Sequence, residues 1–210
     1  MPITLSYADA EKAFKEILTQ YYPYLPGDVY KLVTAKPITD VYEICDASKY
    51  KSLFDITWNR TFQKANAMLF PGKVFAASSV PAFTTDVDDI STRKIYLQDG
   101  VVNSWGTYYH EAIHYLQHRD LYPLYYATGG QAPFKMEGLT EYLTRYFSTR
   151  VARERDNNQS YQKNYLATKS WIGNDLKREG DLFQMNFSGT GLSSSASSAQ
   201  IVNLLSGIIP

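Results

Sequence analysis

The sequence predicts an α+β domain that is mostly helical and carries a small sheet. Several stretches longer than ten residues have apolar side chains at every third or fourth position, the period of an amphipathic helix. Shorter segments between them alternate or run apolar in the manner of strands. With 210 residues, 44% of them hydrophobic and 20% charged, the chain is long enough for one domain with its own core.

The N-terminal part is expected to begin with a helix over residues 7–21, where apolar residues recur among lysines and glutamates. Residues 23–27 contain two prolines and a glycine, which should end this helix. Residues 29–44 are richer in Val, Ile, Thr and Tyr and are interrupted by Pro37. This composition predicts short strands.

The middle of the chain combines one long helix with two strands. The helix is expected over residues 46–69, with Asp46 as its N-cap. Strands are expected over residues 73–78 and 93–98. The acidic loop between them, residues 86–89, lacks the spaced ligands and the glycine of an EF-hand loop, so we interpret it as a solvated turn.

The C-terminal half is expected to be helical. Asp99-Gly100 closes the second strand, and Asn103 or Ser104 is the expected N-cap of the helix that follows. Two more helices are expected at residues 134–155 and 160–177. We therefore expect one domain over residues 1–187 and a tail over residues 188–210, which begins with a Ser- and Gly-rich stretch typical of linkers.

Composition excludes several classes of function. Lysine and arginine balance aspartate and glutamate at 21 each, so nothing indicates a nucleic-acid partner. Apolar runs are shorter than the ~18 residues of a membrane span. The N-terminus lacks the pattern of a secretory signal, which makes the cytoplasm the default location, although export by a dedicated secretion system would leave the same sequence. The single Cys45 cannot form an intramolecular disulfide and is expected to be a small buried residue.

One motif carries chemistry, His110-Glu111-Ala-Ile-His114. On a helix the two histidines lie one turn apart, about 6 Å along the axis, so their rings can converge on one tetrahedral ion. Glu111 lies beside them and is suited to take a proton from an activated water. From the numbers of His and Glu in the chain, the motif is expected by chance only about 0.002 times. We therefore predict a Zn²⁺ site rather than a pair of buried structural histidines.

The third ligand is expected from the next helix. Our choice is Glu137, because the 22 residues after His114 leave room for a loop and a returning helix. Glu141 falls one turn further along the same face. There it could accept a hydrogen bond from a ligating histidine and orient its ring.

The combination of His-Glu-x-x-His with Glu137-Gly-x-x-Glu141-Tyr resembles the gluzincin metallopeptidases, which include thermolysin-like and aminopeptidase-type zinc enzymes. The resemblance covers about residues 92–147. It implies a zincin-type fold, zinc held by His110, His114 and Glu137, and Glu111 as the base that activates water. It also implies that residues 95–97, Ile-Tyr-Leu, form the edge strand along which an extended substrate peptide lies.

Two other residues compete for roles at the metal. Asp120 lies ten residues after His110, where metzincin-type enzymes place their third ligand, but that pattern needs a glycine at the position of Gln117. His118 is about 12 Å along a helix from His110, too far to share one ion. We interpret His118 as a residue that supports a metal ligand without binding the metal, or as a surface residue.

The predicted function is zinc-dependent hydrolysis of peptide bonds in a peptide or protein substrate. Tyr161 and Tyr165 are the candidates for stabilising the oxyanion, since no histidine follows His118. Two alternatives stay open. One is a non-catalytic zincin-like binding module with a structural zinc, and the other is a toxin or effector metalloprotease delivered into another cell.

Overall fold

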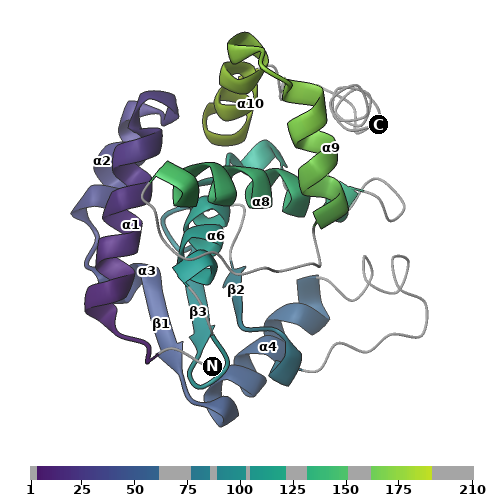
Figure 1. Cartoon of the computed structure of the whole chain (residues 1–210). Helices are drawn as coiled ribbons and strands as arrows, with labels where there is room; N and C mark the ends of the chain where they lie inside the picture. Colours follow the sequence, from purple (N-terminus) through teal and green to yellow (C-terminus); the bar gives the residue numbers. More distant parts are fainter. Residues whose placement is uncertain are drawn as a thin grey trace.

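The computed structural model describes residues 4–61, 77–85, 89–102, 105–121, 132–150 and 162–190. Within these residues the protein is mostly helical, and three short strands form one mixed sheet (Figure 1). The expectation of a mostly helical α+β fold is confirmed.

Helix α1 (Tyr7–Tyr21) has the predicted bounds. Its N-cap is Ser6, whose hydroxyl accepts a hydrogen bond from the Asp9 amide at 3.1 Å. The apolar side of the helix, which includes Phe14 and Ile17, is buried, and α1 packs against the helix that carries the His-Glu-x-x-His motif. Helical periodicity was sufficient to predict this helix, because one of its faces packs against the core.

The prediction of strands over residues 29–44 was largely wrong. The chain forms a short 3₁₀ turn (Tyr22–Tyr24), then α2 (Gly27–Ala35) and α3 (Ile38–Val41), and strand β1 (Tyr42–Cys45) overlaps the predicted range only at residues 42–44. Pro26 and Pro37 are the N-caps of α2 and α3. A proline at this point costs no helical hydrogen bond, so local helix starts override the β propensity of the residues that follow.

Of the strand predicted over residues 73–78, residues 73–76 lie outside the described residues, and its last two residues belong instead to a 3₁₀ turn (Ala77–Ser79). Strand β2 (Ala82–Thr85) was not predicted. The strand predicted over residues 93–98 is confirmed as β3 (Lys94–Gln98). The acidic loop lies outside the described residues up to Asp88, so its interpretation as a solvated turn stays a prediction.

The strand order is β1-β3-β2, with β1 parallel and β2 antiparallel to β3. Residues 95–97 therefore belong to the central strand, and the expectation that they form the edge was wrong. Strand β2 is an edge of the described sheet and contacts the motif helix. Apolar composition alone could not separate the two positions, because both strands are largely buried.

Helix α4 (Ala47–Thr61) begins where predicted, and the Asp46 carboxylate caps it by accepting a hydrogen bond from the Lys49 amide at 2.9 Å. The predicted continuation to residue 69 lies outside the described residues. Asp99-Gly100 forms the predicted turn, with Gly100 at a φ of 75°. Asn103 and Ser104 lie outside the described residues.

The helices that follow are α6 (Trp105–Leu116), a 3₁₀ turn (Arg119–Leu121) and α8 (Ala132–Arg150). The single helix predicted over residues 160–177 is instead two helices, α9 (Gln162–Ile172) and α10 (Leu176–Ser188). Gly173 has a φ of 58°, which ends α9, and Asp175 caps α10. Residues from 191 onward lie outside the described residues.

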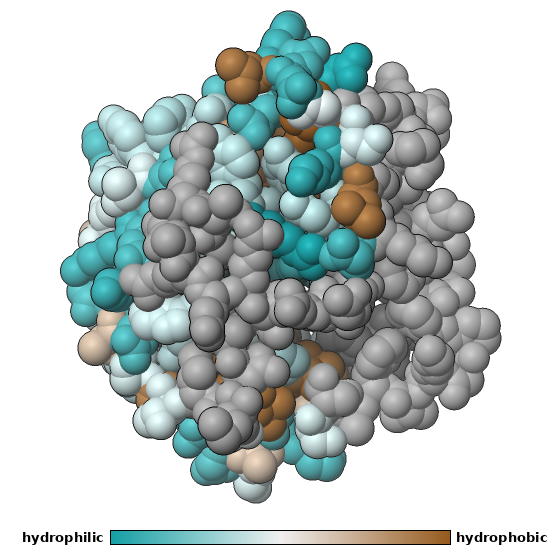
Figure 2. Space-filling view, in the orientation of Figure 1, coloured by the Kyte–Doolittle hydropathy of each residue, from teal (hydrophilic) through white to brown (hydrophobic). Residues whose placement is uncertain are grey.

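Helix α6 lies at the centre of the molecule. It contacts α1, α8, β2 and β3, and α8 crosses it (Figure 1). Nine of its twelve residues are buried. The described surface seen in Figure 2 is mostly hydrophilic, with strongly apolar residues only in small groups. No helix within the described residues is long and apolar enough to cross a membrane.

Candidate metal centre

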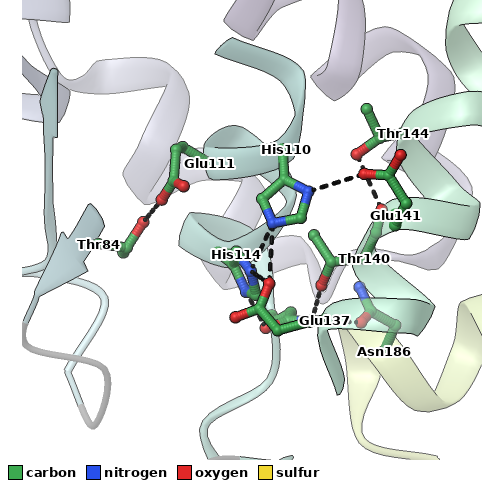
Figure 3. Close-up of polar contacts among 10 residues, drawn as sticks. Thr84, His110, Glu111, His114, Glu137, Thr140, Glu141, Thr144 and Asn186 are labelled. Carbon is green, nitrogen blue, oxygen red and sulfur yellow. Dashed lines mark hydrogen bonds and ion pairs between the residues drawn. The ribbon is translucent and has the colours of Figure 1, made fainter. Parts of the chain in front are cut away.

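Three side chains from two helices meet at the crossing of α6 and α8 (Figure 3). The His110 and His114 rings project from successive turns of α6, as their spacing predicted. Glu137 projects from α8 and supplies the third ligand atom. Of the described residues, these are the ones whose His, Cys, Asp or Glu ligand atoms converge in a group that could hold a metal ion.

The three ligand atoms form a nearly equilateral triangle. Glu137 Oε2 lies 3.0 Å from His110 Nε2 and 3.1 Å from His114 Nε2, and the two nitrogens are 3.1 Å apart. A tetrahedral ion with bonds of about 2.0–2.1 Å keeps its ligands about 3.3 Å apart. The triangle is therefore close to the size that zinc requires.

The other ring nitrogens show which atoms of the histidines carry protons. His110 Nδ1 lies 3.4 Å from Glu141 Oε2, and His114 Nδ1 lies 2.9 Å from Gln117 Oε1. Both partners are oxygen acceptors, so each Nδ1 carries the proton that faces them. In a neutral imidazole this leaves the Nε2 lone pair, and both lone pairs then point at the same carboxylate oxygen. A cation bound between the three atoms would replace this repulsion between lone pairs with attraction.

Charge at the site favours a cation as well. Burial acts to lower the pKa of His110, but Glu137 and Glu141 outweigh it and raise this pKa to about 10. Burial acts to raise the pKa of Glu137, yet the two histidines hold it well below its usual range. The site therefore favours an added positive charge next to its carboxylates, either a proton or a metal ion.

Glu141 is fixed from two sides. Its carboxylate contacts His110 and accepts a hydrogen bond from Arg145 Nε at 2.5 Å. Burial acts to raise the Glu141 pKa, but His110 and Arg145 lower it. Arg145 also donates to Gln162 on α9 and lies over the Tyr165 ring, 4.3 Å from its centroid. The structure thus brings Glu141 to the ring it was predicted to orient.

Glu111 lies on a different side of α6 from Glu137. It is buried, and Oε2 accepts a hydrogen bond from Thr84 Oγ1 of strand β2 at 2.9 Å. Figure 3 shows its carboxylate directed towards β2 and away from the two histidine rings. Because Thr84 engages one oxygen, Oε1 remains to act as an acceptor.

The other residues considered lie away from the three ligand atoms. Asp120 lies in the 3₁₀ turn after α6, where its carboxylate is 3.6 Å from His118 Nδ1. Burial is the main cause of a lowered pKa for His118. Tyr165 contacts Arg145, and no described contact joins its hydroxyl to the ligand atoms. Tyr161 lies outside the described residues.

Sequence reasoning missed the residues that support the site from outside. Thr84 was unassigned because its strand was not predicted. Arg93 is buried, and its Nη1 donates to the carbonyls of Tyr115 and Gln117, which fixes the C-terminal end of α6. Gln117 could have been found, because it lies one turn after His114 on the same side of the helix.

Comparison of the chain with family models, with curated proteins and with solved structures found no match. The assignment of the site therefore rests on the residues and distances of this chain.

Proposed function

We propose that the protein is a zinc-dependent peptidase of the gluzincin type, with zinc held by His110, His114 and Glu137. The observation that carries the proposal is the triangle of ligand atoms, 3.0–3.1 Å on each side, formed by two histidines and one carboxylate. Two imidazoles and one carboxylate are the protein ligands of catalytic zinc in several hydrolases, and they leave a coordination position for water or substrate.

When bound, zinc would act as a Lewis acid that polarises the substrate carbonyl and lowers the pKa of the water bound to it towards about 7. Glu111 takes the proton from the attacking water and passes it to the nitrogen of the leaving amine as the C–N bond breaks. Thr84 holds one carboxylate oxygen of Glu111, which leaves the other to accept the proton. Glu141 keeps the Nδ1 proton on His110, so that Nε2 faces the metal.

A second candidate is a non-catalytic zinc-binding module, in which the metal only holds α6 and α8 together. The direction of the Glu111 carboxylate, towards β2, favours this reading. Three protein ligands favour the peptidase, because structural zinc sites almost always use four.

Two measurements test the proposal. The first is the zinc content of protein that has been stripped with a chelator and reloaded, for which we expect about one zinc per chain. The second is mapping of new peptide termini in a proteome-derived peptide library treated with the zinc-loaded protein. Loss of cleavage on chelation and its return with zinc support a peptidase. One tightly bound zinc without any cleavage supports the module, and failure to take up zinc at neutral pH rejects both.

A further inference from the structure

The end of α6 is joined to α10 by buried amide side chains that the catalytic proposal does not use. Gln117 is 1% exposed and follows directly after the last turn of α6. Its Oε1 lies 2.9 Å from His114 Nδ1, on the side of the ring opposite the ligand triangle. His110 has a carboxylate in this role, whereas His114 has a neutral amide.

In the structure, the amide nitrogen of Gln117 faces two oxygen atoms. Its Nε2 donates to Thr140 Oγ1 at 2.8 Å and to Asn186 Oδ1 at 3.0 Å. Oε1 must then face His114, which puts the ring proton on Nδ1 and leaves Nε2 for a metal. If both amides were reversed, Gln117 would donate to His114 Nδ1. The proton would then be on Nε2, where a metal could not bind.

A backbone hydrogen bond joins Asn186 to the segment that follows α6. Asn186 is fully buried, and its backbone carbonyl accepts a hydrogen bond from the His118 backbone amide at 2.8 Å. Gly189, the C-cap of α10, has a φ of 69° and lies so close to the His118 ring that a Cβ would be 2.5 Å from Nδ1. A side chain at this position would be strained and would displace the His118 ring, so the close approach of α10 to His118 favours glycine.

We propose that Gln117 is a positioning residue of the metal centre and that Asn186, on α10, orients it. The chain of contacts from Asn186 through Gln117 to His114 selects the tautomer of His114 that can bind zinc. The inference rests on the proposed zinc site, and it adds α10 to the elements on which that site depends.

The test compares zinc affinity, by competition with a chromogenic chelator, in three proteins. Gln117→Leu removes the acceptor and should weaken zinc binding about 10- to 100-fold, the usual effect of losing a hydrogen bond to a ligating histidine. Gln117→Glu restores an acceptor and should bind within about threefold of the unaltered protein, or more tightly. It can be accommodated, because the Thr140 hydroxyl, which accepts from Gln117 Nε2, can rotate and donate to the new carboxylate instead.

A purely structural role for Gln117 would weaken zinc binding in both variants alike, and that result would overturn the proposal. Equal zinc affinity of Gln117→Leu and the unaltered protein would also overturn it. Failure of the unaltered protein to bind zinc would instead reject the metal site itself, so the two failures are distinguishable.

A second readout does not depend on any variant folding. Long-range ¹H–¹⁵N correlation spectra of the unaltered, zinc-loaded protein report which nitrogen of His114 carries the proton. We expect a proton on Nδ1 that exchanges slowly with water, because Gln117 holds it in a buried site. A rapidly exchanging proton, or coordination of zinc through Nδ1, would contradict the proposal.

Discussion

The two sides of helix α6 hold their functional side chains in different ways. On the side of α8, each histidine is held through both ring nitrogens: His110 by Glu137 and Glu141, and His114 by Glu137 and Gln117. On the side of the sheet, the Glu111 carboxylate has one hydrogen-bond donor among the described residues, Thr84. Ligands of a metal benefit from such rigid support, whereas a base that accepts and releases a proton must be able to change partners.

The largest expected effect is that of Glu137→Ala, which removes one side of the ligand triangle. We expect zinc affinity to fall by far more than about 100-fold, which is the largest loss typical of a residue that only hydrogen-bonds to a ligand, since only two histidines remain as ligands. Activity should be lost with the metal. Chelator competition measures the affinity, and Asp120→Ala is the matched control.

Asp120→Ala should leave both zinc affinity and activity nearly unchanged, because Asp120 contacts His118 rather than the ligand atoms. Loss of zinc in Asp120→Ala, with retention in Glu137→Ala, would show that the third ligand has been misassigned.

On the other side of α6, Glu111→Gln should separate catalysis from metal binding. Removing a general base costs about 10²- to 10⁴-fold in turnover, while zinc affinity should stay within a few fold, because Glu111 is outside the triangle. Steady-state kinetics on a peptide found by cleavage mapping, together with the metal content of each sample, measure both quantities. Unchanged turnover would mean that another residue is the base or that a contaminant cleaves the peptide.

Glu141→Ala tests the contact between the Glu141 carboxylate and His110 Nδ1. We expect a loss of about 10- to 100-fold in zinc affinity, less than for Glu137→Ala. Because the variant also leaves the Arg145 charge without its carboxylate, Arg145→Gln is the control: it breaks the same ion pair but keeps the contact with His110. If both variants lose zinc equally, the ion pair rather than the contact with His110 is what matters.

The smallest effect is expected for Thr84→Val, which removes the hydroxyl that donates to Glu111 and keeps the shape of the side chain. One lost hydrogen bond to a charged group is worth about 1.5 kcal/mol, or about tenfold in turnover. Zinc affinity should not change. A large loss of zinc would show that the two sides of α6 are not independent.

Much of the candidate metal centre was predictable because its geometry is local. Two histidines four residues apart on a helix must project from the same side, whatever the rest of the fold does. Glu137 and Glu141 follow the same rule on α8, and the structure brings both to the histidines. The start of α4 at Asp46 was also predictable, because a cap is a local contact between side chain and backbone.

Other features could not be predicted from local patterns. Residues 29–41 contain many strand-forming side chains, yet two prolines set helix starts that the surrounding structure retains. Strand order depends on pairings between distant segments, so apolar composition could not tell that β3 is central and that β2 borders α6.

By itself, the sequence determined the pair of histidines, the position of Glu111 beside them and the helical spacing of the two glutamates, because each depends on residues within one or two helical turns. Only the tertiary structure decided which partners surround them. Thr84 comes from 27 residues before Glu111, and Asn186 from 69 residues after Gln117. Contacts over such separations follow from how whole elements pack, and no periodicity in the chain encodes them.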